Sequence, residues 1–265
     1  MSKTVLRIKN LQKSYDDQKV ILKGISLDVH AGHFIGLIGL SGAGKSTFLR
    51  CINRLVDPSG GQILAPSQLF LEDGNESEVD IVTLKGSELR HWRRRTGMIF
   101  QQFNIAKRLT VIQNVLSGKL GYVNPFASTL RMFSKEDKEW ALINLERVGL
   151  LSHAYKRSDA LSGGEQQRVA IARTLMQKPR LILADEPVAS LDPKLATTVL
   201  DILKTVSQED NITTIVSLHT LEMTRRYSDR VIGLAQGEIA FDDKPANLSE
   251  EEVSNIYQRY MKSKS

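Results

Sequence analysis

The sequence predicts an α/β fold, and three features of the chain support this expectation. Short apolar runs typical of buried strands occur at Phe34–Ile38, Leu181–Ala184 and Thr213–Ser217. A glycine-rich turn follows the first run, and Ser46–Ile52 after that turn has the pattern of a helix. The stretch Phe103–Met176 has helical apolar spacing. We therefore expect strands and helices to share one core.

The glycine-rich turn carries the clearest chemical signal. It fits Gly-x-x-x-x-Gly-Lys-[Ser/Thr], a loop that cradles phosphates with backbone N–H groups that glycine leaves unobstructed. The helix N-terminus that follows adds unpaired donors and a partial positive charge. The turn consists of Gly39, Leu40, Ser41, Gly42, Ala43, Gly44, Lys45, Ser46 and Thr47. We expect Lys45 to reach the β- and γ-phosphates of a nucleotide and the Ser46 hydroxyl to ligate Mg²⁺. The alternative is a chance glycine-rich turn, which the flanking strand and helix disfavour.

The bulk composition is that of an ordinary globular chain. Its 265 residues suffice for one large domain or for a domain with a subdomain. The net charge of +6 suits an acidic partner such as nucleic acid, anionic lipid or a phosphate-bearing ligand, with a solvated basic surface as the default explanation. Cys51 is the only cysteine, so a disulfide framework is excluded and a packing role in a reducing compartment is expected.

Hydropathy predicts no membrane-spanning segment. No run reaches the ~18 apolar residues of a span, and Arg7 and Lys9 interrupt any early apolar leader. The expectation is a soluble cytoplasmic protein that reaches a membrane only through its partners.

The first third of the chain predicts a small antiparallel unit. Strand patterns occur at Val5–Leu11 and Val20–Val29, with a bulge expected at Gly24. Ser87–Arg95 has a helical pattern and is very basic, which favours either an anion or partner surface or a solvated face. A short strand follows at Gly97–Phe100. The basic residues of the helix are Arg90, His91, Arg93, Arg94 and Arg95.

Amphipathic helices are expected in the middle of the chain. Between them, Gly118–Ser134 predicts a loop or broken helix with exposed apolar groups, either a contact surface or a packing lid. Leu109, Ile112, Val115 and Leu116 share one helix face, and a second amphipathic helix contains Trp140, Ile143, Leu145 and Val148 and ends at Gly149.

The last third predicts a helix, a hairpin and a helical tail. Asp192 and Pro193 form an N-cap and a first helical position, so a helix is expected through Leu203. Strands at Val231–Ala235 and Glu238–Phe241 are expected to pair around Gln236 and Gly237, and the tail Ser249–Ser265 is expected to be helical.

A second nucleotide signal lies at the end of the Leu181–Ala184 run. Asp185 is delivered to the carboxyl edge of the sheet, where a carboxylate can support Mg²⁺ in enzymes with such a phosphate loop. Glu186 follows it and is the candidate general base for the attacking water. A strand that ends in Asp-Glu is a weak signal alone, but it supplies what the glycine-rich loop lacks.

The stretch Leu161–Arg168 predicts a second phosphate site. Ser162 and Glu165 form a Ser-x-x-Glu capping box on the helix that follows. A capping box does not explain Gly163 and Gly164, which weaken a first helical turn but allow a phosphate to approach its N-terminus. A single nucleotide could contact both the glycine-rich loop and this second site only if the two sites came from two different chains.

These motifs together resemble those of ABC transporter ATPases, over roughly Leu6 to Asp242. In the order of the chain, the matching elements are Tyr15 as the adenine-stacking aromatic, Gly39–Thr47 as Walker A, Gln101 as the Q-loop glutamine, Leu161–Gln167 as the signature, Leu181–Asp185 as Walker B with Glu186 as catalytic glutamate, Ala189–Asp192 as the D-loop and His219 as the switch histidine.

The resemblance implies an architecture. We expect a P-loop NTPase with a RecA-like mixed sheet core, an antiparallel β subdomain and an inserted α-helical subdomain at about 103–178. The cassette would span 1–242, and 243–265 would form a C-terminal helical tail.

The resemblance also implies a mechanism. Two ATP molecules would bind in a head-to-tail homodimer, each between Walker A of one chain and Ser162, Gly163, Gly164 and Glu165 of the other. Mg²⁺ would be held by Ser46, Gln101 and Asp185, Glu186 would activate water, and His219 would contact the γ-phosphate. Asp192 would communicate across the dimer. Without the motif order, His219 and Tyr15 would be interpreted as ordinary structural residues.

A narrower resemblance is to the ATP-binding subunits of phosphonate importers and their phosphite-importing relatives. It rests on Ile99–Asn104, Arg108–Val111, Asn114–Gly121, Ile182–Pro193 and the length of the Gly118–Ser134 insertion. It implies integral-membrane permease subunits, a solute-binding protein acting indirectly, and a place on the cytoplasmic face of the plasma membrane, with no nucleic acid. A permease helix would dock beside Gln101.

Other functions were weighed against this interpretation. An ABC ATPase of an exporter or regulator, or one serving a different solute, shares every motif. A DNA-repair ATPase suits the positive charge but needs long coiled coils, and no sustained heptads lie between Gln101 and Leu161. A ribosome-associated factor needs two cassettes, whereas the chain has one phosphate loop.

Overall fold

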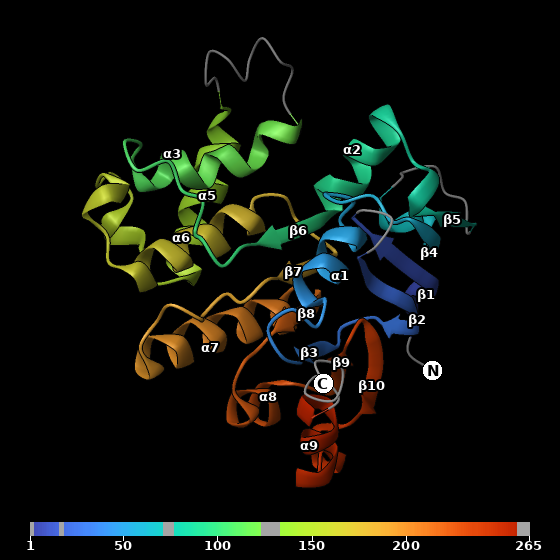
Figure 1. The fold of residues 1–265 in the computed structure, drawn as a ribbon. Helices are drawn as coiled ribbons and strands as arrows, with labels where there is room; N and C mark the ends of the chain where they lie inside the picture. Colours follow the sequence, from blue (N-terminus) through green and yellow to red (C-terminus); the bar gives the residue numbers. More distant parts are fainter. Residues whose placement is uncertain (1–2, 16–18, 71–76, 123–132, 259–265) are drawn as a thin grey trace.

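A computed structural model describes residues 3–15, 19–70, 77–122 and 133–258. Two sheets form its framework, with a helical layer beside them (Figure 1). The larger sheet has six strands in the order β10-β9-β3-β8-β7-β6, and the smaller has four in the order β2-β1-β4-β5. The strands are β1 (Thr4–Ser14), β2 (Val20–His30), β3 (Phe34–Ile38), β4 (Gly60–Pro66), β5 (Glu78–Asp80), β6 (Thr96–Ile99), β7 (Leu181–Ala184), β8 (Thr213–Ser217), β9 (Arg230–Ala235) and β10 (Glu238–Asp243).

The larger sheet is parallel except at one edge. Strand β3 pairs in parallel with β8 and β9, and β7 lies between β8 and β6, whereas β10 is antiparallel to β9. The residues of β3, β7 and β8 are buried throughout, as expected for strands covered on both faces. The predicted α/β fold with a mixed sheet is confirmed.

Successive residues of these strands face two different cores. Phe34 and Ile182 belong to the cluster shared with the helical layer, whereas Ile35 and Leu183 belong to the cluster shared with the smaller sheet. This follows from the two-residue period of a strand. It explains why the apolar runs are continuous rather than alternating.

The smaller sheet is antiparallel, as predicted. Strands β1 and β2 pair along their lengths, with a register shift between the pairs Leu11–Ile25 and Gln12–Lys23. The shift falls on Gly24, whose φ is +94°, so the predicted bulge is present.

The helical layer is built from three capped helices. They pack on one another and on β6 and α7, and 3₁₀-helix η3 (Ser117–Tyr122) continues α3. Thr110, Ser134 and Ser162 are their N-caps. The helices of the whole chain are α1 (Lys45–Ile52), α2 (Gly86–Arg95), α3 (Val111–Leu116), α5 (Lys135–Arg147), α6 (Gly163–Leu175), α7 (Pro193–Glu209), α8 (Leu221–Tyr227) and α9 (Glu250–Gln258).

The second predicted amphipathic helix is present as α5, but one of its apolar residues faces outward. In α5 the buried side chains are Ala141, Asn144 and Leu145, continued by Val148, whereas Ile143 is 45% exposed. Residues at i, i+3, i+4 and i+7 share a face, and Asn144 takes the place that apolarity alone assigned to Ile143. Its amide donates to the Trp140 carbonyl oxygen at 2.9 Å.

The predicted insertion at 118–134 is described only at its ends, because residues 123–132 lie outside the described part. Leu120 is 41% exposed, in line with an exposed apolar group. Gly118 is buried and lies against α6, where a Cβ would overlap the carbonyl oxygen of Arg173. Backbone contact of this kind fixes η3 to α6.

We expect Gly118→Ala to destabilise the fold, because the added methyl must push η3 away from the α6 backbone. Overpacking of this kind costs about 1–3 kcal/mol, which urea unfolding of the full chain measures. Gly121→Ala is the matched control, since its Cβ would meet Arg94 at 3.5 Å, an ordinary contact. Equal stability of the two variants would contradict the close approach.

The C-terminal elements extend beyond their predicted limits. Helix α7 continues to Glu209 rather than ending at Leu203, and β10 ends at Asp243. Helix α9 packs on the larger sheet through Ile256, in a cluster with Ile38 and Phe241. Residues 259–265 of the predicted tail lie outside the described part. No helix among the described residues is long and apolar enough to cross a membrane.

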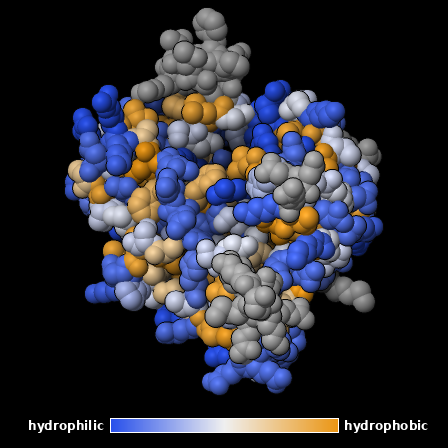
Figure 2. Space-filling model, in the orientation of Figure 1, coloured by the Kyte–Doolittle hydropathy of each residue, from blue (hydrophilic) through white to orange (hydrophobic). Residues whose placement is uncertain are grey.

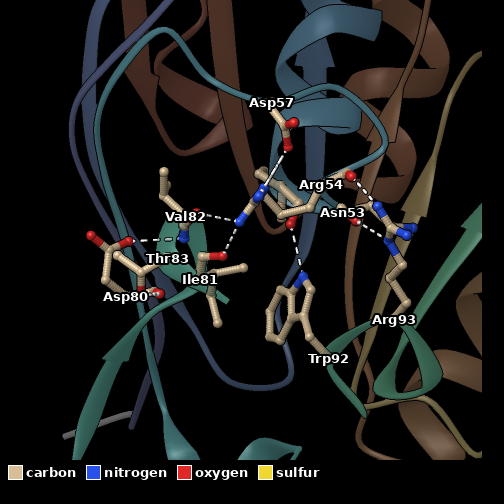
Figure 3. Close-up of polar contacts among 10 residues, drawn as sticks. Asn53, Arg54, Asp57, Asp80, Ile81, Val82, Thr83, Trp92 and Arg93 are labelled. Atoms are coloured by element: carbon tan, nitrogen blue, oxygen red, sulfur yellow. Dashed lines mark hydrogen bonds and ion pairs between the residues drawn. The ribbon is translucent and has the colours of Figure 1, made fainter. Parts of the chain in front are cut away.

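Side chains of α2 hold the C-terminal end of α1 (Figure 3). The Trp92 indole N–H donates to the Ile52 carbonyl oxygen at 2.9 Å, and the Arg93 guanidinium donates to the carbonyl oxygens of Asn53 and Arg54. The last carbonyls of a helix lack intrahelical partners and attract cations. Arg93 is therefore a structural residue, and it belongs neither to an anion or partner surface nor to a solvated face.

Arg54 is the centre of this network. Its guanidinium is buried between the carbonyl oxygens of Ile81 and Val82, the second at 2.5 Å, and also donates to the Asp57 carboxylate at 2.9 and 3.0 Å (Figure 3). The side chain thereby ties the end of α1 to the turn that precedes α2.

Candidate nucleotide site

The phosphate loop has the strand–loop–helix arrangement that the sequence predicts. Strand β3 ends at Ile38 and α1 begins at Lys45. Gly39 has a φ of +148°, and a Cβ there would overlap the carbonyl oxygen of Leu234 in β9, so only glycine fits. The Gly237 N–H donates to the Ala43 carbonyl oxygen at 3.1 Å, which fixes the loop against the β9–β10 turn.

Lys45 folds back over this loop. Its ammonium donates to the carbonyl oxygens of Gly39 and Leu40 at 2.8 and 3.2 Å and lies 3.9 Å from the Glu186 carboxylate. The side chain is only 4% exposed, and this burial lowers the pKa of Lys45 against the opposing pull of the carboxylates of Glu186 and Asp185. The cation lies where a phosphate chain above the loop would meet it.

Ser46 and Asp185 bring two side-chain oxygens together. The Ser46 hydroxyl donates to Asp185 Oδ1 at 2.7 Å, and Arg50 Nη2 lies 3.3 Å from Asp185 Oδ2. Mg²⁺ prefers hard oxygen ligands and keeps several waters and substrate phosphates. No group of three or more acidic, histidine or cysteine side chains among the described residues is arranged to hold a metal ion, so this donor set fits Mg²⁺ brought with a nucleotide better than a metal held by protein alone.

Glu186 and His219 meet beside this pair. Glu186 Oε2 lies 2.8 Å from His219 Nε2. Glu186 has a φ of +50°, unusual for a residue other than glycine, and its N–H donates to the Ser217 hydroxyl at 2.7 Å. Ser217 was missed by the sequence analysis, because a serine inside a buried strand carries no motif. Its hydroxyl holds the Glu186 backbone in place.

The topology brings these groups to one edge of the sheet. The loop follows β3, Asp185 and Glu186 follow β7, and His219 follows β8, which lies between the other two strands. The carboxyl ends of parallel strands share one edge, where open α/β sheets bind ligands. Residues far apart in the sequence thus surround one phosphate-binding loop.

The second predicted phosphate site lies on another element. Ser162 is the N-cap of α6. The N–H and the hydroxyl of Ser162 donate to Glu165 Oε2 at 2.8 and 2.7 Å, and these hydrogen bonds lower the pKa of Glu165. The predicted capping box is present. Gly163 and Gly164 lie against Leu191 and Leu195, at the start of α7. In the described part of the chain, no hydrogen bond or ion pair joins Ser162–Glu165 to the phosphate loop.

Residues 22–189 match the ABC transporter family. The chain belongs to the ABC transporter family. It is 48% identical over 254 residues to "Phosphonates import ATP-binding protein PhnC 2" of Halalkalibacterium halodurans, covering 96% of this chain and 100% of that protein. It is 44% identical over 252 residues to "Phosphonates import ATP-binding protein PhnC" of Nitratidesulfovibrio vulgaris, covering 95% of this chain and 91% of that protein.

Solved ABC structures have the same fold. The dimeric cassette MJ0796 bound to ADP and Pi has a TM-score of 0.74 at 33% identity, covering 91% of this chain and 98% of that one. The cbiO1 chain of Clostridium perfringens, part of the cbiONQ transporter complex, has a TM-score of 0.77 at 26% identity, covering 94% and 92%. The predicted family and the predicted P-loop ABC ATPase fold are confirmed.

Gln101 of this ABC ATPase makes no hydrogen bond to Ser46 or Asp185 among the described residues. It is exposed and lines a groove of about 550 Å³ with Phe103, Gln166 and Ser190. Its predicted role as a Mg²⁺ ligand stays a prediction.

Arg173 binds the backbone of the segment that follows Gln101, and the sequence analysis did not predict this contact. Its guanidinium donates to the carbonyl oxygens of Asn104 and Phe103 at 2.6 and 3.0 Å, and burial lowers its pKa. Since Arg173 belongs to α6, it connects the signature helix to the Q-loop. Carbonyl acceptors have no sequence signature, so nothing in the sequence indicated this contact.

Tyr15 and Asp192 have local surroundings compatible with further roles. Tyr15 is 51% exposed, and Lys13 Nζ lies 4.9 Å from its ring centroid. Asp192 caps α7, where its Oδ1 accepts from the N–H groups of Lys194 and Leu195 at 3.1 Å. Adenine stacking by Tyr15 and communication by Asp192 stay predictions.

Proposed function

We propose that the chain is the ATP-hydrolysing subunit of an importer for phosphonates or related phosphorus oxyanions such as phosphite. The observation that carries the ATPase part is the convergence of Lys45, the Ser46–Asp185 pair and the Glu186–His219 pair on one phosphate loop. The solute is supported by relatives named as phosphonate import proteins, whose whole lengths this chain nearly covers.

The residues divide the work of phosphoryl transfer to water. Lys45 and the loop N–H groups bind the β- and γ-phosphates, and Ser46, Asp185 and Gln101 would hold Mg²⁺. Mg²⁺ when bound neutralises charge on the phosphates. Glu186 orients and deprotonates the attacking water, while His219 holds the Glu186 carboxylate at 2.8 Å and reaches the γ-phosphate.

A second chain completes each nucleotide site. The capped N-terminus of α6 is formed by Ser162, Gly163, Gly164 and Glu165, whereas the phosphate loop precedes α1. In a head-to-tail homodimer, the α6 N-terminus of one chain would face the phosphate loop of the other. The related cassette MJ0796 with ADP and Pi is itself dimeric. Tyr15 would stack on adenine in this dimer, and Asp192, at the start of α7 beside the signature glycines, would communicate across it.

The permease would dock on the helical layer. A groove of about 580 Å³ is lined by apolar side chains of α3 and α5, including Ile112, Leu116 and Leu142, and Figure 2 shows apolar residues at the surface in the upper part of the molecule. The permease helix itself would dock in the groove beside Gln101, which Gln166 of α6 also lines. Docking there places the chain on the cytoplasmic face of the membrane, where it responds to the solute-binding protein only through the permease.

Reconstitution tests the proposal. The chain is incorporated into liposomes with its permease subunits, and ATPase activity is measured with the solute-binding protein loaded with a phosphonate, with phosphite or left empty. We expect the phosphonate-loaded protein to raise the ATPase rate several-fold over the empty one. Stimulation by an unrelated solute alone would contradict the proposed substrate but not the ATPase assignment.

A further inference from the structure

A basic cleft between α2 and η3 takes no part in the nucleotide site. It consists of two adjoining cavities of about 200 and 230 Å³ that share Arg94 and Tyr122. Arg90 and Gln177 line the second cavity, and His91 lines the first. No acidic side chain is among the described residues that line either cavity.

Arg94 lies in this cleft and has no charged partner among the described residues. Its guanidinium carbon lies 5.0 Å from the Tyr122 ring centroid, and the Tyr122 hydroxyl donates to the carbonyl oxygens of Arg94 and Gln177 at 3.1 and 2.7 Å. Arg94 Nε is buried without a hydrogen-bond partner. Within the described structure the guanidinium makes no ion pair, although a buried donor left unpaired is costly.

Two other polar groups line the cleft, the exposed guanidinium of Arg90 and a buried amide oxygen of Gln177. Arg90 lies one helical turn before Arg94, hence on the same face of α2, and it has no hydrogen bond or ion pair within the described part. Gln177 Oε1 is buried without a partner. The nearby cation Lys119 is already paired, since its ammonium lies 3.4 Å from the Asp137 carboxylate.

We propose that this cleft binds a protonated phosphorus oxyanion, such as hydrogenphosphate, a phosphonate or a phosphate monoester. The forked donors of Arg90 and Arg94 match the oxygens of a tetrahedral anion. The P–OH group of such an anion supplies the donor that Gln177 Oε1 lacks. Sulfate has the same shape but carries no proton at neutral pH, so it binds more weakly.

Calorimetry with inorganic phosphate tests the site on the full chain. The protein is kept in chloride buffer with saturating Mg²⁺ and a non-hydrolysable ATP analogue, so that the β- and γ-phosphate positions of the phosphate loop are both filled. Because each substitution removes charge-assisted hydrogen bonds to the anion, Arg94→Gln and Arg90→Gln should each weaken phosphate binding by about tenfold or more. Arg108→Gln is the matched control, since Arg108 is exposed, lies outside the cleft and should leave binding unchanged.

The source of the anion is decided by a second arm, cosedimentation with phosphatidylcholine vesicles with or without phosphatidic acid. Binding of free phosphate alone indicates a soluble ligand, and Arg94-dependent binding to phosphatidic acid vesicles indicates a lipid headgroup. Binding of neither, equal binding of sulfate, or phosphate binding that survives both substitutions would overturn the proposal. The exposed position of Arg90 keeps the test valid if Arg94→Gln does not fold.

Discussion

Replacing Glu186 with glutamine is expected to lower the rate of ATP hydrolysis by about 10²–10⁴-fold, the usual effect of losing a general base. The amide keeps the size of the carboxylate but cannot accept the proton of the attacking water. Lys45, Ser46 and Asp185 are unchanged, so nucleotide binding should persist. With hydrolysis blocked, the variant should run as a dimer in Mg-ATP and as a monomer without it.

Two measurements check this expectation: phosphate release under single-turnover conditions, and size-exclusion chromatography with and without Mg-ATP. Glu209→Gln is the matched control, because Glu209 is exposed and pairs with Arg147 far along α7. It should hydrolyse ATP at the wild-type rate. A Glu186→Gln protein with wild-type turnover would remove Glu186 from the mechanism.

The second large effect is on stability. Arg54→Met should lower the free energy of unfolding by about 2–4 kcal/mol, because it removes the guanidinium hydrogen bonds to the carbonyl oxygens of Ile81 and Val82 and leaves Ile81 with only the longer bond from the Leu84 N–H at 3.4 Å. Methionine fills much of the same volume, so the loss reports the hydrogen bonds more than a cavity. The urea midpoint of the full chain should fall with little change in slope.

Asp57→Asn separates the two halves of this network. Asp57 is the ionic partner of Arg54, yet its side chain is 77% exposed. Exposed ion pairs contribute at most about 1 kcal/mol, so this variant should unfold close to the wild type. A larger loss in Asp57→Asn than in Arg54→Met would assign the stability to the ion pair and contradict the carbonyl contacts.

The parts of the fold that the sequence predicted are those governed by local rules. The buried runs of β3, β7 and β8, the bulge at Gly24 and the cap at Ser162 each depend on a few neighbouring residues. The phosphate loop was also predictable, because its glycines and Lys45 lie within nine consecutive positions and Lys45 binds backbone oxygens of the same loop. Family resemblance then supplied roles for Gln101 and His219 that spacing alone does not.

The features that were missed depend on long-range acceptors or on helix rotation. Ser217, Arg93 and Arg173 all act on backbone groups of distant segments, and a backbone group leaves no mark in the sequence. The outward position of Ile143 and the buried position of Asn144 in α5 do not follow from apolarity. Asn144 is buried nonetheless, since its amide has a partner in the preceding turn.

Because Trp92 contacts the end of α1, intrinsic tryptophan fluorescence can report on the position of this helix. The sequence has two tryptophans, and Trp140→Phe would leave only Trp92. Its indole N–H is bonded to the last turn of the helix whose first turn forms the phosphate loop. Intrinsic emission of that single-tryptophan protein therefore follows any shift of α1 on nucleotide binding, and unlabelled ATP can be titrated directly.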